Sequence, residues 1–348
     1  MKVTRKDIAA AAGVSPSTVG MILSGQGQNY NPVTRKRVLK TAEKLGYQVS
    51  VNARALRLQR SFLFGVLLNE VNAHLSAQFL LGIQSSMGST DYSPVVFFSK
   101  AEVDQEHCLG RCLNRHVDAM IVNCSVDGPE QDRLAAFAAR LNRLQIPVVE
   151  VYGRFLSGIP SVNVDNAEGG RLGTSHLADL GHQRIALITH ERYENSVVHL
   201  DAWEQFRGYR EVLTARGLEP RVITPKMDLG NVTIPAFVQA GQDSLDLLLS
   251  QPERPTAVVC YSDLMAYGLN RACRERGIRV PEDLSIAGNY DMLLSSVVNP
   301  PLTTTRSNHF EIGCRAADSL LRALQGETVG DQLVAPDFVA RQSTGPVG

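Results

Sequence analysis

Short apolar runs recur along most of the chain, each followed by a stretch with helical spacing. From Phe62 onward the runs are FLFGVLL, PVVFFS, DAMIVN, PVVEVY, SVNVD, RIALIT, TAVVCY and LSIAGNY. Runs this short and apolar are typical of parallel strands that helices cover on both faces. The alternation predicts an α/β body whose parallel strands are covered by helices on both faces. No GxGxxG or P-loop motif follows the first run, so nothing indicates a nucleotide cradle.

The first 60 residues differ from this body in charge. They hold eleven basic side chains but only two acidic ones, Asp7 and Glu43, which is a net charge of +9. The remainder carries −9, because the whole chain has 35 basic and 35 acidic side chains. This asymmetry favours a polyanion such as nucleic acid as the partner of the head over a merely solvated basic surface.

The head is predicted to be an α-helical unit of three short helices. Thr4 and Asp7 have the spacing of a capping box, and the first helix should end at Gly13. Ser15 is a good N-cap and Pro16 suits the first position of a second helix. A tight bend between two short helices is typical of a helix-turn-helix, although plain helical hairpins share the pattern.

The later head helices have clear apolar stripes. The second should end at Ser24 and Gly25, with Val19, Ile22 and Leu23 inward and Ser17, Thr18 and Met21 on another face. The third begins at Asn31 and Pro32 and ends before Gly46, with Val38, Ala42 and Leu45 on one stripe. Together the three stripes predict one small core.

Several other classes of protein are disfavoured. The start lacks a secretory signal and no run approaches a membrane span, so a cytoplasmic protein without a membrane partner is expected. Six scattered cysteines show no zinc spacing. His176, His182, His190 and His199 lack a metal spacing, and no GxSxG elbow occurs, so we expect neither an enzyme nor a metal or other cofactor.

The chain resembles the lactose/galactose repressor (LacI/GalR) family along nearly its whole length. The head carries VTRKDIAAAAGVSPSTVGMILSG, TRKRVLKTAEKLGY and ARALR. The body carries, in order, GVLLNEV, DAMIVN, IPVVEV, VNVDNAEGGRLGTSHLADLGHQRIAL, FRGYREVL, PTAVVCYSDLMAYGL, VPEDLSIAGNYD and NPPLTTTR.

The resemblance implies a domain plan. A helix-turn-helix DNA-binding domain at 1–48 precedes a hinge or linker at 49–60 and an effector-binding and dimerisation domain at 61–348. By this resemblance, the effector-binding domain is expected to contain two doubly wound parallel-sheet subdomains of the periplasmic-binding-protein type I kind. They would comprise about 61–162 plus 291–325, and about 163–290 plus 326–348, with crossovers near 161–164, 290 and 325.

The resemblance to the LacI/GalR family also implies which head residues contact DNA. Thr4, Ser15, Ser24 and Thr34 would contact phosphates, while Pro16, Ser17 and Met21 would occupy base-reading positions, with Thr18 beside them. Many relatives have serine and arginine where this chain has Gly20 and Met21. Met21 cannot read guanine as arginine does; it would touch a thymine methyl group or fill a gap.

The linker is expected to fold into a short hinge helix on DNA. Leu56, flanked by Ala53 and Arg54, matches the leucine that wedges into the minor groove, although it could be a core leucine. Val49 and Ser50 replace a proline and an asparagine found in many relatives, which bears on the stiffness of the hinge.

The family pocket maps onto residues that follow strands or begin helices. The expected effector-binding residues are His74, Leu75, Ser76, Asn123, Tyr152, Val164, Trp203, Gln205, Ser262, Tyr290, Asp291 and Ser307. Sugar-binding relatives have arginine at 205, aspartate at 290 and often aspartate at 152, so a less polar or more aromatic ligand, or weak sugar binding, is predicted. Some of these side chains could simply pack. Asp165 and Asp263 adjoin helix starts, and capping is preferred for Asp165.

The function predicted is that of a transcriptional regulator, a repressor that binds a palindromic DNA operator as a homodimer. A small-molecule effector, such as a sugar or sugar derivative, would modulate its DNA affinity. The chain ends without a leucine heptad, which favours a dimer over a tetramer. Two alternatives remain: a DNA-binding protein whose body is a ligand-independent dimerisation scaffold, and a solute-binding receptor.

Overall fold

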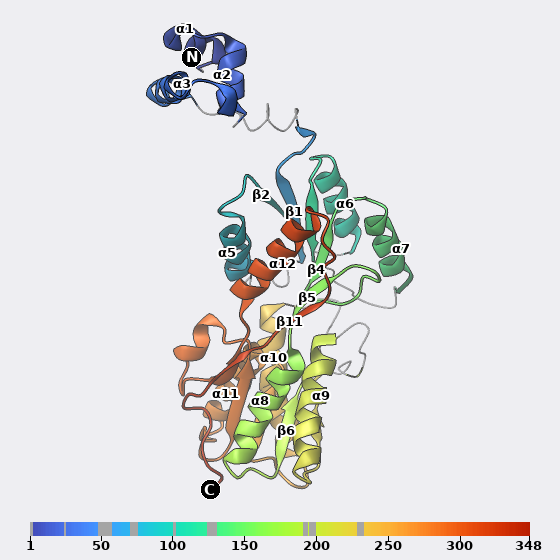
Figure 1. Cartoon of the computed structure of the whole chain (residues 1–348). Helices are drawn as coiled ribbons and strands as arrows, with labels where there is room; N and C mark the ends of the chain where they lie inside the picture. Colours follow the sequence, from blue (N-terminus) through green and yellow to red (C-terminus); the bar gives the residue numbers. More distant parts are fainter. Residues whose placement is uncertain are drawn as a thin grey trace. The chain divides into compact units, whose positions relative to one another are not determined.

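The computed structural model describes residues 3–23, 26–47, 58–69, 76–99, 102–123, 131–190, 194, 200–227 and 233–348. It divides into two compact units, residues 1–61 and residues 62–348 (Figure 1). The first unit is the basic head and the second is the α/β body. Each unit is described by itself below.

The head consists of short helices around one apolar core. Its helices are α1 (Arg5–Ala12), α2 (Pro16–Leu23), η1 (Gly27–Asn29) and α3 (Pro32–Lys44). The core contains Ile8, Ala9, Ala12, Val19, Ile22, Val38 and Ala42. The three predicted helices are confirmed. Leu45 is not part of the core stripe: it is 37% exposed, because α3 has already ended at Lys44 and Leu45 is its C-cap.

The body contains two six-stranded sheets, and every predicted apolar run forms a strand. The first sheet has the order β2 (Ser93–Ser99), β1 (Leu63–Asn69), β3 (Ala119–Val122), β4 (Val148–Val151), β5 (Ser161–Val164) and β11 (Gln332–Val334), all parallel. The second has the order β7 (Arg221–Ile223), β6 (Ile185–Ile188), β8 (Ala257–Cys260), β9 (Ser285–Asn289), β10 (Thr303–Arg306) and β12 (Asp337–Val339). Only β12 is antiparallel to its neighbour in that sheet.

Pairs of helices cover both faces of each sheet. On the first sheet, α5 (Ser76–Met87) and α12 (His309–Ala323) share a core on one face, while α6 (Glu102–Leu113) and α7 (Gln131–Asn142) share the other. On the second sheet, α8 (Asn166–Asp179) and α9 (Leu200–Ala215) lie opposite α10 (Ile234–Leu249) and α11 (Asp263–Glu275). A short 3-10 helix, η3 (Leu293–Ser296), precedes β10. The predicted doubly wound architecture is confirmed.

Three of these helix pairs touch through glycines. The pairs are Gly82 and Gly313 in α5 and α12, Gly170 and Gly208 in α8 and α9, and Gly241 and Gly268 in α10 and α11. A Cβ atom at any of these glycines would lie 1.9 to 2.2 Å from a carbonyl oxygen of the facing helix. Since a carbon atom cannot approach a non-bonded oxygen atom so closely, only glycine at these positions permits the observed distance between the paired helices.

The chain crosses between the sheets after β5, after β10 and after β11. The first crossing, at Asp165, agrees with the expected one near 161–164. The other two expected boundaries were wrong. The strand β10 belongs to the second sheet, so the second crossing follows Arg306 rather than residue 290. The strand β11 belongs to the first sheet, so the last crossing lies between Val334 and Asp337 rather than near 325.

Substitution of one contact glycine tests the helix packing. We expect Gly208→Ala to lower the unfolding free energy of the body by about 3 kcal/mol, because its Cβ would lie 1.9 Å from the Ala167 carbonyl oxygen. Gly110→Ala is the matched control in α6, since no atom lies within 4 Å of its Cβ position. It should be neutral or stabilise the body by up to about 1 kcal/mol. Urea unfolding measures both, and equal stability of the two variants would contradict the prediction.

Candidate functional site

The bend between α1 and α2 is built from local capping bonds. Gly13 ends α1 with a left-handed backbone, φ 65°, and the Val14 amide donates to the Ala9 carbonyl over 3.1 Å. The Ser15 hydroxyl oxygen accepts the Thr18 amide at 3.0 Å, and Pro16 is the first residue of α2. The predicted turn is therefore confirmed, and it places the second helix directly after the first.

The two faces of α2 differ as the sequence predicts. Val19 and Ile22 are buried in the core of the head, whereas Ser17 and Met21 are exposed, Met21 by 38%. Pro16 is also exposed. Pro16, Ser17 and Met21, which are expected to read bases, thus lie on an open surface of α2.

The residues expected to contact phosphates differ in their hydrogen bonds and in their exposure. Both the backbone amide and the hydroxyl of Thr4 donate to Asp7 Oδ2, at 2.8 and 2.7 Å, which confirms the capping box. The Thr4 hydroxyl can donate to a phosphate only after leaving Asp7. Thr34 is half-buried in the first turn of α3. Ser24, Ala53, Arg54 and Leu56, like His74 and Leu75 of the expected pocket, lie outside the described residues.

The body has its candidate site at the carboxyl edge of the sheets. In both sheets the strand order begins 2-1-3-4-5, counting along the chain within each sheet, so a topological switch point lies beside the first strand. Ligands of doubly wound sheets bind at the carboxyl ends of the strands next to such a point. Most of the expected effector residues follow strands at this edge.

In the first sheet, two expected residues are held by internal bonds. Asn123 follows β3 and its amide donates to the Val151 carbonyl at 3.0 Å. Tyr152 follows β4, and its hydroxyl lies 3.0 Å from Nδ1 of His309, the first residue of α12. Ser76 starts α5 and is buried, as is Val164 at the end of β5. The Tyr152–His309 contact links β4 to the helix that follows the second crossing.

In the second sheet, three buried oxygen atoms have no hydrogen-bond partner in the described part of the chain. They are Oε1 of Gln205, Oγ of Ser307 and Oγ1 of Thr189. Gln205 Nε2 donates to the Cys260 carbonyl over 3.2 Å, which leaves Oε1 as a pure acceptor. Because buried polar atoms are normally satisfied, oxygens of this kind bond to a buried water molecule or to a polar ligand. Thr189 was missed from the sequence, although it is the last residue of the predicted run RIALIT and directly follows β6.

Aromatic side chains surround this edge of the second sheet. The Tyr261 hydroxyl donates to the Asp201 carboxylate, and the ring of Tyr261 meets those of Tyr290 and His190 edge-on, with centroids 6.4 and 5.3 Å away. Burial raises the pKa of both tyrosines, so their hydroxyls stay neutral. Tyr261, Asp201 and His190 were not predicted. The signal was available for Tyr261 and His190, which follow β8 and β6.

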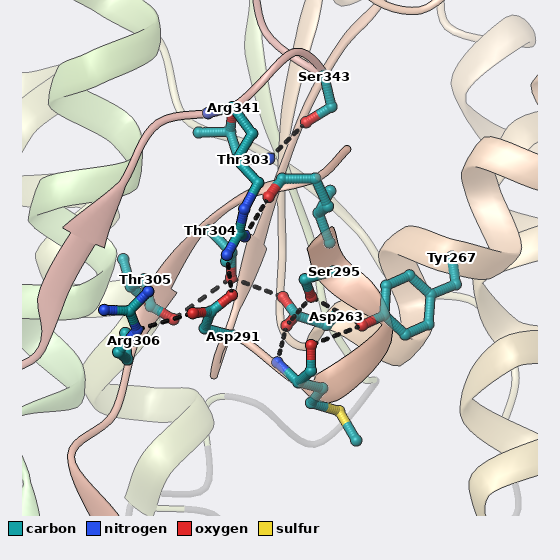
Figure 2. A network of polar contacts seen from close by, with 12 residues as sticks. Asp263, Tyr267, Asp291, Ser295, Thr303, Thr304, Thr305, Arg306, Arg341 and Ser343 are labelled. Carbon is teal, nitrogen blue, oxygen red and sulfur yellow. Dashed lines mark hydrogen bonds and ion pairs between the residues drawn. The ribbon is translucent and has the colours of Figure 1, made fainter. Parts of the chain in front are cut away.

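Two further expected effector residues, Trp203 and Asp291, are held by contacts within the protein. The ring of Trp203 lies against Phe206, with centroids 5.9 Å apart, and the guanidinium of Arg210 lies over it. The Asp291 carboxylate accepts Arg306 Nε at 2.8 Å and Arg341 Nη2 at 2.7 Å, and its side chain is only 10% exposed (Figure 2). Trp203 thus packs along α9, and Asp291 joins loop, strand and C-terminal segment; contact of these two residues with an effector stays a prediction.

Asp263 organises the same region from inside (Figure 2). Its carboxylate accepts the Met292 amide at 2.6 Å, the Ser295 hydroxyl at 2.7 Å and the Thr304 hydroxyl at 2.6 Å. Burial raises its pKa to about 6. Ser262, not Asp263, caps α11 by accepting the Met265 amide. The preference for Asp165 as a cap is confirmed, since it accepts the Glu168 amide at the start of α8.

Glu150 shapes the loop that follows Tyr152. It is completely buried in β4, and its two carboxylate oxygens accept the amides of Phe155 and Leu156 at 3.1 and 2.9 Å. Burial raises its pKa to about 7. A glutamate inside an apolar run was the available sequence signal, and it was missed.

No cluster of potential metal ligands occurs among the residues the structure describes. His176 contacts the hydroxyl of Thr344 over 2.8 Å, and His182 lies between Thr256 and the Gly345 carbonyl. Both histidines therefore fasten the C-terminal segment to the second sheet. Of the helices in the described ranges, none is both long and apolar enough to span a membrane.

Known proteins share this combination of head and body. The family model described as bacterial regulatory proteins, lacI family, matches residues 4–50, and that of the periplasmic binding protein-like domain matches residues 174–344. Catabolite control protein A of Priestia megaterium is 30% identical over 96% of both chains. The lactose operon repressor of Escherichia coli is 30% identical over 98% of this chain and 91% of its own.

Solved structures agree. The lac repressor dimer bound to operator and the anti-inducer ONPF matches with a TM-score of 0.79 at 29% identity, over 99% of this chain and 100% of that one. The complex of the regulator CelR with cellobiose matches with a TM-score of 0.67 at 26% identity, over 98% and 100%. A helix-turn-helix head on a periplasmic-binding-protein-like body defines a ligand-responsive class of DNA-binding regulators. The chain belongs to the lacI family of bacterial transcriptional regulators.

The buried glutamate predicts a pH dependence of stability. A pKa of about 7 in the folded body, against an ordinary 4.5, means that ionisation favours the unfolded chain. The stability that Glu150 contributes is therefore complete below about pH 4.5 and is lost as the pH rises through 7. Glu150→Gln should remove this part of the decline, so its stability relative to the wild type should increase from pH 5 to pH 8.

Urea unfolding across this pH range measures the difference. Glu253→Gln is the control, because Glu253 has a side chain 68% exposed in the same body. The raised pKa of Asp263 also lowers the stability of the folded body as the pH rises. This contribution is the same in every variant, so it cancels when the variants are compared. Parallel pH profiles for Glu150→Gln and the wild type would show that the prediction is wrong.

Proposed function

We propose that this chain is a homodimeric repressor that binds an inverted-repeat operator and changes its DNA affinity when a small neutral effector binds to its body. The observation that carries the proposal is the pairing of two features. An exposed face of α2 lies on a head of net charge +9, and three unsatisfied buried oxygens lie at the carboxyl edge of the second sheet.

The chemistry of the side chains separates the proposed phosphate contacts from the proposed base contacts. We assign phosphate contacts to Thr4, Ser15, Ser24 and Thr34, since hydroxyl groups donate to phosphate oxygens without reading sequence. Base contacts are assigned to the exposed face with Pro16, Ser17, Thr18 and Met21. In the linker, Leu56 would enter the minor groove beside Ala53 and Arg54 and kink the duplex.

A homodimer fits this assignment. One short helix reads only a few base pairs, and a two-fold dimer doubles the site into an inverted repeat. The lac repressor that this chain resembles was solved as a dimer bound to operator. Because the proposed target of this chain is DNA, we place the chain in the cytoplasm.

For the effector, the described residues favour a neutral donor of hydrogen bonds. Gln205 Oε1 can only accept, so the ligand must offer a hydroxyl or N–H group there. The two cations beside the second crossing, Arg306 and Arg341, are both paired with Asp291, and Arg154, in the loop after β4, is paired with Asp331. An anionic ligand would therefore lack a partner among them. The other assigned residues are His74, Leu75, Ser76, Asn123, Tyr152, Val164, Ser262, Tyr290 and Ser307.

The hinge proposal predicts a selective loss of DNA binding. Leu56→Ala should weaken specific operator binding at least tenfold and leave binding to random DNA within twofold, because the wedge is needed only for the kinked complex. Affinity should also fall steeply with salt, since basic residues release counterions from phosphates. Fluorescence anisotropy of labelled duplexes measures both effects. Leu58→Ala is the control in the same segment; wild-type operator affinity in Leu56→Ala would refute the wedge.

The effector proposal is tested on the full chain by titration calorimetry with neutral saccharides, nucleosides and aromatic glycosides, alongside sugar phosphates. We expect a neutral compound to bind and to change operator affinity, and Gln205→Leu to weaken its binding about 5- to 150-fold by leaving the ligand donor unpaired. Gln251→Leu, far along the chain in a surface turn, is the control. If none of these compounds binds and operator affinity stays constant, the body is a dimerisation scaffold.

A further inference from the structure

An arginine from α1 lies against the reading face of α2. Ser17, Gly20 and Met21 are three and four residues apart, so they share one face of this helix, away from the buried Val19. Gly20 contributes no side chain to the middle of that face. A Cβ atom at Gly20 would lie 3.6 Å from Nη1 of Arg5, which is ordinary contact distance. The guanidinium of Arg5 therefore lies next to the position of a side chain at residue 20.

The stability of the head does not account for this arginine. Arg5 is the first residue of α1, where a cation opposes the helix dipole at a cost of about 0.3–1 kcal/mol. It is exposed, and no ion pair joins it to a carboxylate within the described ranges. Asp7, the nearest acidic residue in sequence, is bonded to Thr4 instead. The cation is left available to an external partner on the same surface as Met21.

We propose that Arg5 reads a guanine in each half-site, across Gly20. This inference rests on the proposed DNA-binding function of the head. Guanidinium groups recognise guanine by donating two hydrogen bonds to its O6 and N7 atoms in the major groove. Met21 has no hydrogen-bond donor and Ser17 offers only one hydroxyl, so the guanidinium that can donate two hydrogen bonds at this face of α2 comes from the neighbouring helix. Gly20 places no side chain between Arg5 and this face, and a methyl group there would lie at ordinary contact distance from Arg5.

The alternative contact for an exposed arginine is a phosphate, and the two contacts leave different signatures. Loss of a base contact removes discrimination at one base pair and spares the others. Loss of a phosphate contact weakens all sequences about equally and lowers the slope of the salt dependence by about one. Arg5→Gln gives a further distinction, because glutamine pairs with adenine through two hydrogen bonds.

The experiment starts with selection of binding sites from randomised duplexes by the full-length protein. Failure to enrich an inverted repeat would refute the proposed function itself. From an enriched site, every base pair of the half-site is then substituted singly and its affinity is measured with the wild type, Arg5→Ala and Arg5→Gln. The control is Arg37→Ala, an exposed arginine on α3. Circular dichroism checks that each head is folded.

We expect the wild type to prefer guanine at one position by about 5- to 150-fold. In Arg5→Ala that preference should fall to within twofold, and in Arg5→Gln it should move toward adenine. Arg37→Ala and Gly20→Ala should keep the wild-type pattern, the latter because its methyl group fits at contact distance. A uniform loss at all positions, or an unchanged pattern in both Arg5 variants, would overturn the assignment while leaving the enriched repeat intact.

Discussion

The buried carboxylate of Asp263 fixes the part of the body on which the candidate effector site depends. An isolated charge in a protein interior is costly, and here three donors from η3, the residue before it and β10 offset that cost. The bonds require close approach, since a Cβ atom on Gly288 would lie 2.2 Å from Asp263 Oδ1. They hold the strand whose continuation carries Ser307 and leads into α12. The carboxylate of Asp263 therefore ties η3 and β10 together just before the second crossing.

The body could be predicted from the sequence where apolar runs report burial. All eight runs became strands, but β10, with the sequence TTTR, was missed and its segment was assigned to the wrong subdomain. Its threonines are buried because their hydroxyls find partners: Thr304 with Asp263, Thr305 with Asn289. Those partners are distant in sequence, so hydropathy cannot reveal the strand. The strands β7, β11 and β12 were also missed. Each has three residues and lies at the edge of its sheet, so it contains no apolar run that could be recognised in the sequence.

In the head, local chemistry was predictable and side-chain placement was not. Capping at Thr4, Gly13 and Ser15 involves residues within a few positions of one another, so the bend could be derived from the sequence. The approach of Arg5 to Gly20 joins two helices and became visible only in three dimensions. The same distinction applies to the body: Gln205 and Ser307 reach the edge of the second sheet, whereas Asp291 finds two arginines that no local pattern pairs with it.

The crossings join the two sheets covalently, so a ligand that contacts a crossing acts on a segment shared by both sheets. At the second crossing, Ser307 carries an unsatisfied hydroxyl and His309, two residues later, is bound by Tyr152 from β4. A ligand that bonds to Ser307 therefore acts on a segment already tied to the first sheet. Such a ligand shifts the arrangement of the sheets only by its difference in affinity for their alternative arrangements. For the proposed effector, release or recruitment of DNA thus depends on which of these arrangements it binds more tightly.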